Sequence, residues 1–221
     1  MIIHSIESDV KFPDMEYYDM HKPGEMALYL AHSDLFPFRS VIENNKLALD
    51  AINETYRNTA EAARLQDDFI TESYALTSGL LSTSRVDILT QYSLLITMVS
   101  LLEESVNTLC NIYCDLQNET VKLTDVKGNG LERAATYLKK HIGISGFTSD
   151  KQWGYITAIR DARNMIVHNG GRLIRDFDKF NKFDIKYREE DNQIYLEYHD
   201  IVKMYDAILD FMERSFRLEP K

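Results

Sequence analysis

The strongest constraint on the fold lies in residues 85–117, where apolar side chains recur at every third or fourth position. This spacing is typical of an α-helix. The stripe consists of Leu89, Tyr92, Ile96, Val99, Leu102, Val106, Leu109 and Tyr113. Leu95, Leu101 and Ile112 widen it. A stripe of this width predicts a helix buried on more than one side, as in the core of a bundle.

Residues 39–74 carry a second helical pattern. Its apolar face contains Leu49, Ile52, Tyr56, Ala60 and Ala63. Small and polar residues follow at Ser78-Gly79 and at 82–84. They predict a break between the two helices, with Ser84 as the N-cap of the second.

Three further helices are predicted in the second half of the chain, over 131–141, over 151–169 and from Asp200 to near the end. Residues 183–188 and 194–198 alternate apolar and polar side chains, which predicts a β-hairpin at 183–198. The expected fold class is therefore all-α. We expect an up-and-down bundle of about five main helices, with the small hairpin inserted before the last one.

The chain of 221 residues is long enough for one sizeable core. Pro13, Pro23 and Pro37 break any long helix near the start, so residues 1–38 are predicted to form an irregular, aromatic-rich arm packed over the core, with room for one short helix at 24–32. Residues 39–221 are predicted to form one helical domain.

The formal net charge of −10 argues against a protein that coats nucleic acid non-specifically, because such binding depends on neutralising phosphates. This net charge is compatible with a local basic cleft. Residues 172–188 contain six cations and three acids, a local charge of +3.

The N-terminal residues Met1–Asp9 lack a basic start and carry early acids, unlike a signal peptide. No membrane span is expected, and we expect a cytoplasmic protein. Cys110 and Cys114 are interpreted as small core residues, because a metal site would need two more nearby ligands. The histidines show no ligand spacing with one another, so neither a metal nor a cofactor is expected.

The helix predicted at 151–169 combines one apolar and one polar face. Asp161, Asn164 and His168 lie within about 60° of one another on a helical wheel, flanked by Arg160. Arg163 precedes Asn164, and Asn169-Gly170-Gly171 ends the helix.

Arg163-Asn164-Met165-Ile166-Val167-His168, late in a glycine-terminated helix, resembles the motif of HEPN-domain (higher eukaryote and prokaryote nucleotide-binding) ribonucleases. These proteins carry an arginine, often followed by a polar residue, and then a histidine at short spacing. The resemblance covers about residues 85–217. It implies a helical bundle that forms a homodimer, with the motif helices of two chains lining one cleft.

The resemblance assigns catalysis to Arg163, Asn164 and His168. Histidine titrates near neutrality and suits proton transfer, whereas arginine carries a permanent charge that can grip two phosphate oxygens. Asn164 would position either group. Supporting or RNA-binding roles are assigned to Arg160, Asp161, Glu103, Asn169 and Arg172.

The predicted function is that of a metal-independent endoribonuclease using the 2′-hydroxyl of RNA as nucleophile. By resemblance it is a toxin or antiphage effector, restrained by an antitoxin or a defence-system partner. The alternative is a non-catalytic HEPN dimer that binds RNA or nucleotides, or that regulates a partner. A helical adaptor without a ligand is a third hypothesis.

Geometry limits the first hypothesis, because five residues on a regular helix separate Arg163 and His168 by about 140°. The two side chains do not share a face, so the resemblance implies that a second subunit completes the site. Structural roles remain open as well. His168 could interact with the helix dipole, and Arg163 could pair with Asp161 or with a glutamate such as Glu103.

Overall fold

The computed structural model describes residues 12–221, except for the side chains of residues 80–83. The long helices are α1 (Pro23–Leu65), α2 (Phe69–Gln117), α4 (Trp153–Asn169) and α6 (Tyr198–Ser215). Shorter elements are η1 (Met15–Tyr17), η2 (Leu123–Asp125), α3 (Gly130–Tyr137), η3 (Leu138–Ile142), η4 (Phe147–Ser149) and α5 (Phe177–Lys182). The predicted all-α class is confirmed.

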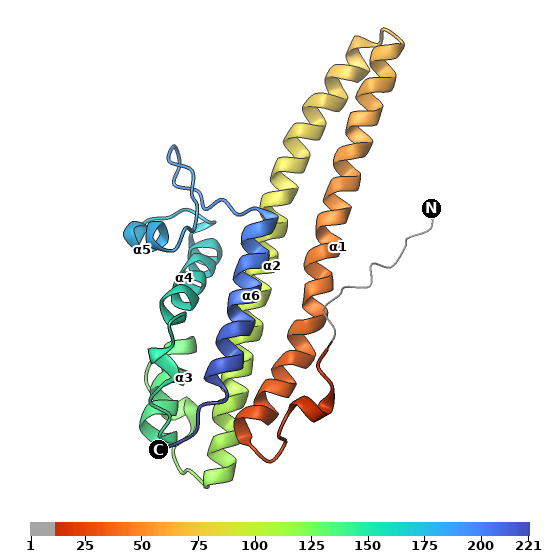
Figure 1. The fold of residues 1–221 in the computed structure, drawn as a ribbon. Coiled ribbons are helices and arrows are strands. Elements are labelled where there is room, and N and C mark those ends of the chain that lie inside the picture. Colours follow the sequence, from red (N-terminus) through yellow and green to blue (C-terminus); the bar gives the residue numbers. More distant parts are fainter. Residues whose placement is uncertain (1–11) are drawn as a thin grey trace.

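Helix α2 is the central element, and it contacts α1, α3, α4 and α6. The buried part of its predicted stripe consists of Tyr92, Leu95, Val99, Leu102, Val106, Leu109 and Tyr113. Figure 1 shows α6 beside α2, with α3 and α4 forming a second layer. Burial from several sides explains why this helix needs an apolar stripe wider than a single contact face.

Helices α1 and α2 form a long antiparallel hairpin whose outer end projects beyond the other helices (Figure 1). Among the side chains that the structure describes near this end, small ones are buried between the two helices, including Ala60, Ala63 and Ala75. Gly79 allows the closest approach, since a Cβ there would lie 2.9 Å from Cβ of Tyr56. Small residues thus let two helices pack closely without a third.

The prediction of an irregular arm over residues 1–38 is wrong from Pro23 onward, because α1 begins there and runs far beyond the short helix allowed at 24–32. Pro23 stands in the first turn of α1, where a proline costs no hydrogen bond. Pro37 lies inside the helix on its exposed side. The buried neighbours Leu35, Phe38 and Ile42 continue the helical face across it. Packing along this face maintains the helix through a residue that disfavours it locally.

The predicted break at Ser78-Gly79 and at 82–84 is also wrong, because α2 continues through both and Ser84 is not a cap. The turn lies earlier, at Gln66–Asp68. Asp67 adopts a left-handed backbone conformation with φ 56°. The Asp68 carboxylate accepts a 3.1 Å hydrogen bond from the Thr71 amide and caps α2.

The predicted β-hairpin at 183–198 is not found. Within residues 12–221, β-pairing is limited to two isolated antiparallel bridges, Arg172 with Gln193 and Tyr187 with Ile194. Asp184 and Asn192 have positive φ values, which interrupt any regular ladder. The alternating apolar residues Ile185, Ile194 and Leu196 instead pack one by one onto the bundle.

The segment before α1 packs on α1 and α6 through an aromatic and polar cluster. The Tyr18 hydroxyl lies 2.6 Å from Nδ1 of the fully buried His32. On the other side of the ring, Nε2 lies 3.3 Å from the Glu213 carboxylate. Burial, helped by the charge of Arg217, lowers the pKa of His32 to about 4. The imidazole is therefore neutral near pH 7.

Among the described residues, α2 alone is long and apolar enough to cross a membrane by length and composition. Its inner half provides much of the bundle core, including Leu95, Val99 and Leu102. The core helix of a soluble protein has these same properties.

Candidate functional site

The N-terminal end of α4, the helix that carries the motif, is anchored to α6. The Asp150 carboxylate accepts hydrogen bonds of 2.8 and 2.9 Å from Nε and Nη2 of Arg214. These bonds lower the pKa of Asp150 and keep it charged. The side-chain amide of Gln152 donates to Asp210 at 2.5 Å. These contacts fix the start of α4 against α6.

The C-terminal end of α4 is held by a buried polar cluster. Gly170 and Gly171 both have positive φ and end the helix. The Tyr92 hydroxyl donates to the carbonyl of Ile194 at 2.7 Å. The Gln193 amide donates to that hydroxyl at 2.6 Å and to the Gly170 carbonyl at 2.8 Å. A Cβ on Gly171 would lie 2.3 Å from the Tyr92 oxygen, so only glycine fits there.

Arg163 lies where α4 meets α2. Its Nη1 donates to Oδ1 of Asn164 at 2.9 Å. Its Nη2 lies 3.8 Å from Oε2 of Glu103 on α2. The predicted pairing of Arg163 with a glutamate is thus found. Its Nε atom is buried and has no hydrogen-bond partner within the described chain. The side chain is 23% exposed, so this guanidinium is oriented but not enclosed.

His168 lies near the exposed end of α4. Within residues 12–221 its ring makes no hydrogen bond or ion pair. The structure does not bring it together with Arg163, Asn164 or Asp161 within one chain. Arg163 instead bonds to its neighbour Asn164. Arg163 and His168 lie on different faces of a regular helix, so their separation is expected.

Arg160 and Asp161 belong to a separate charged network. The Asp161 carboxylate accepts from Arg160 at 2.8 Å and from Lys179 on α5 at 2.5 Å. Arg160 also pairs with Glu132 on α3 at 2.9 Å. Burial opposes the charge of Arg160, but the hydrogen bonds of its two acidic partners outweigh it and raise its pKa. This network links α4 to α3 and α5.

Asn169 and Arg172 follow the motif without joining Arg163. The Asn169 amide donates to the sulfur of Met165 at 3.2 Å. Arg172 is exposed, and its side chain has no ion pair in the part of the chain that the structure describes. The basic stretch at 172–188 is largely neutralised, because acids pair with Lys179, Lys186, Arg175 and Arg188.

Sequence reasoning missed a polar groove between α2, η2 and α3. It is a cavity of about 510 Å³ lined in part by Asn107, Asn111, Lys122 and Arg133. Asn107 and Asn111 follow Glu103 at four-residue spacing, which places all three on one side of α2. That spacing could have suggested a polar face. The partner elements η2 and α3 could not be placed from the sequence.

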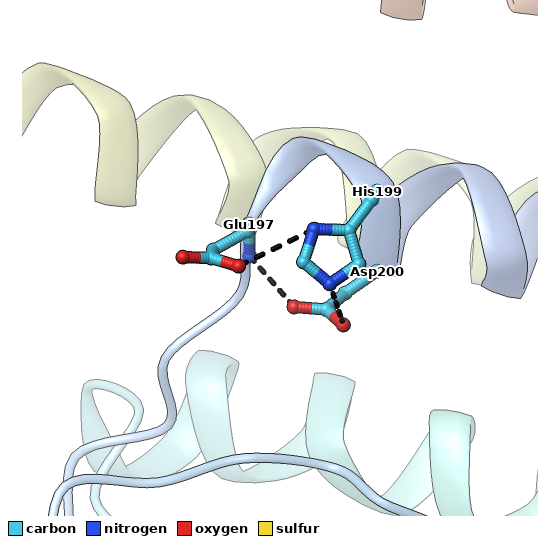
Figure 2. A group of neighbouring side chains, drawn as sticks. All are labelled: Glu197, His199 and Asp200. Atoms are coloured by element: carbon cyan, nitrogen blue, oxygen red, sulfur yellow. Dashed lines mark hydrogen bonds and ion pairs between the residues drawn. The ribbon is translucent and has the colours of Figure 1, made fainter.

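Glu197, His199 and Asp200 form a second group that sequence reasoning missed (Figure 2). One ligand atom of each lies within 4.8 Å of the others, so the group could hold a metal ion. His199 bonds to both acids, at 3.3 and 3.2 Å. Asp200 also accepts from the Glu197 amide at 2.9 Å and caps α6.

The Lys186 ammonium already lies inside this group, 3.4 Å from His199 Nε2 and 3.7 Å from Asp200 Oδ1. A divalent cation would have to displace it. We interpret the three residues as the capped start of α6, with an internal cation balancing the two acids.

Comparisons of the chain with protein-family models, with curated proteins and with solved structures gave no match.

Proposed function

We propose that the chain is a metal-independent endoribonuclease, with Arg163, Asn164 and His168 as its catalytic residues. The observation that carries the proposal is the contrast between Arg163, which other side chains orient, and His168, which is exposed. Glu103 and Asn164 orient the guanidinium of Arg163, and its buried Nε has no hydrogen-bond partner within the described chain. His168 is exposed and has no partner within residues 12–221.

The proposed reaction uses the 2′-hydroxyl of RNA. The 2′-oxygen forms a bond to the adjacent phosphorus, and the bond from phosphorus to the 5′-oxygen breaks. One proton leaves the 2′-hydroxyl and one reaches the departing 5′-oxygen. His168 performs one of these transfers, since an imidazole nitrogen can accept or donate a proton, and solvent water performs the other. Arg163 stabilises the charge that builds on the phosphate oxygens. The products carry a 2′,3′-cyclic phosphate and a 5′-hydroxyl.

The separation of the two side chains around α4 supports a site completed by a second copy of the chain. In this proposal, Arg163 of one protomer and His168 of its partner face the same phosphate. Val167 and Ile174, on either side of His168 in the sequence, are 48% and 60% exposed. Exposed apolar side chains beside a catalytic histidine favour an interface at this end of α4.

The biological role that follows is a toxin or antiphage effector whose activity a partner protein restrains. Expression of the chain in bacteria should stop growth, and His168→Ala should relieve the arrest. Continued growth with the wild-type chain would argue against this role.

The purified chain tests the chemistry directly. Wild-type protein should cleave a mixed RNA pool in EDTA and leave 2′,3′-cyclic phosphate or 3′-phosphate ends. His168→Ala should abolish cleavage while circular dichroism and the melting temperature stay unchanged. Full activity of His168→Ala would refute the proposal, and a strict requirement for a divalent metal would refute the mechanism.

The alternative function is a non-catalytic dimer that binds RNA or nucleotides. One observation favours it. Arg163 already bonds to Asn164 and pairs with Glu103, as a purely structural arginine would. Salt-sensitive RNA binding without cleavage, equal in wild type and His168→Ala, would support this alternative.

A further inference from the structure

The groove between α2, η2 and α3 has the composition of a ligand site. Two amides, Asn107 and Asn111, line it from α2, and Lys122 and Arg133 contribute two cations. Leu123 provides an apolar wall. Its volume of about 510 Å³ lies within the range of small-molecule sites. The groove is large enough for a nucleotide.

Arg133 contributes a donor without an acceptor. Its Nε atom is buried and has no hydrogen-bond partner within the described chain. A buried donor without a partner costs free energy, so a small shift of the Arg133 side chain onto an acceptor in the groove would be favourable. The groove is lined by two cations, Lys122 and Arg133, and one acid, Asp115. The side chains that line the groove therefore carry a formal charge of +1. In a chain with a net charge of −10, this favours an anion.

The groove lies on the same side of α2 as Glu103, the ion-pair partner of Arg163. Glu103, whose carboxylate lies 3.8 Å from Arg163, precedes Asn107 by one turn of α2, a rise of about 5.4 Å. Asn111 follows one turn later. Gly130 starts α3 against this carboxylate, since a Cβ there would lie 2.4 Å from Oε1 of Glu103. The same side of α2 thus leads from Arg163 into the groove.

We propose that this groove binds one nucleotide, with its phosphate held by Arg133 and Lys122 and its base edge recognised by Asn107 and Asn111. Amide groups offer both donors and acceptors, which suits base edges, whereas arginine and lysine suit phosphates. As part of an RNA chain, this nucleotide flanks the scissile phosphate. This placement in RNA rests on the proposed ribonuclease function. A free nucleotide has the same chemistry.

Binding is measured in the His168→Ala background, so that cleavage does not consume the RNA. Fluorescent single-stranded RNA of mixed sequence and AMP are the two probes. Arg133→Gln should weaken binding about tenfold and reduce the slope of log affinity against log salt by about 0.7. The double change Asn107→Ala with Asn111→Ala should weaken binding and keep the salt slope. Arg64→Gln, which removes the same charge at the far end of α1, should change neither.

The two probes distinguish the source of the nucleotide. Loss of RNA binding alone assigns the groove to an RNA residue, and loss of AMP binding alone assigns it to a free nucleotide. Unchanged affinity for both probes in the Arg133 and asparagine variants, with melting temperatures near wild type, would overturn the proposal, as would no binding of either probe. Weakened binding by a chain that never cleaves RNA would keep the groove and refute the ribonuclease.

Discussion

The guanidinium of Arg163 on α4 lies 3.8 Å from the carboxylate of Glu103 on α2. This pair joins the helix that carries the proposed catalytic motif to the central helix of the bundle. Both side chains are only about one-fifth exposed. The orientation of Arg163 therefore depends on the packing of α4 against α2, and this packing is fixed at both ends of α4.

Arg163→Lys should remove most of the RNA cleavage, at least tenfold in kcat/KM, and leave the fold intact. Lysine keeps the charge but lacks the planar fork that grips two phosphate oxygens. If Arg163 served only as an ion-pair partner, the change would be nearly silent, because such pairs contribute about 0–1 kcal/mol. Cleavage rates on the mixed RNA pool, with melting temperatures matched first, separate the two roles.

Glu103→Gln should reduce stability by about 1 kcal/mol or less, since the pair is loose and partly exposed. Cleavage should fall several-fold through kcat, because the neutral amide holds Arg163 less firmly. Glu104→Gln, an exposed glutamate one position later, is the matched control and should leave both quantities unchanged. Equal cleavage by both variants would remove Glu103 from the positioning of Arg163.

Gly171→Ala should destabilise the protein by about 3 kcal/mol. Alanine is strained at φ 85°, and its Cβ would displace the Tyr92 hydroxyl and the Gln193 amide. Gly170→Ala is the control, because φ is also positive but a Cβ would meet nothing within 4 Å. It should cost about 1 kcal/mol. Urea unfolding of both variants measures the difference, and equal costs would contradict the tight packing at the exit of α4.

Acid should destabilise the protein through His32. Its pKa is lowered to about 4 in the folded state from an ordinary value of 6.5, so between these values the unfolded state binds the extra proton. The stabilisation is present above pH 6.5 and is lost as the pH falls toward 4. From pH 7 to pH 5, wild type should lose about 2 kcal/mol more than His32→Asn. Parallel pH profiles of the two proteins would contradict this burial of a neutral imidazole.

The wild-type chain should be a homodimer at micromolar concentration by light scattering. Val167→Glu should shift it toward the monomer and reduce RNA cleavage, because a charge would enter the proposed interface beside His168. Val86→Glu, at a similarly exposed position on α2, should change neither. A wild-type chain that remains monomeric would refute the two-chain site.

The sequence predicted the helical class and the central helix because their signal is carried by many residues together, from Tyr92 to Tyr113. Errors arose where tertiary packing opposes a local preference. Pro37 and Gly79 both predict helix ends, but α1 and α2 continue through them. The buried face around Leu35 maintains α1 through Pro37. In α2, Gly79 lets the helix pack closely against Tyr56.

For the candidate site, the sequence pointed to Arg163 and His168 as proposed catalytic residues, and it suggested a glutamate partner for Arg163, which is Glu103 in the structure. It could not show that Arg160 and Asp161 bond to Glu132 and Lys179, because those partners come from other elements. The groove was missed for the same reason. Asn107 and Asn111 are ordinary polar residues of a helix until α3 and η2 are placed beside them.

The outer half of the α1–α2 hairpin has a consequence for how stability is distributed. Beyond the bundle, and within the part of the chain that the structure describes, these two helices pack on each other through alanines and Gly79 (Figure 1). The side chains described there bury little apolar area, so the backbone amides in this region should exchange their hydrogens through local fraying at a low free energy. Amides of α2 near Val99 and Leu102 should exchange only when the whole protein unfolds. A single continuous helix thereby belongs to two cooperative units.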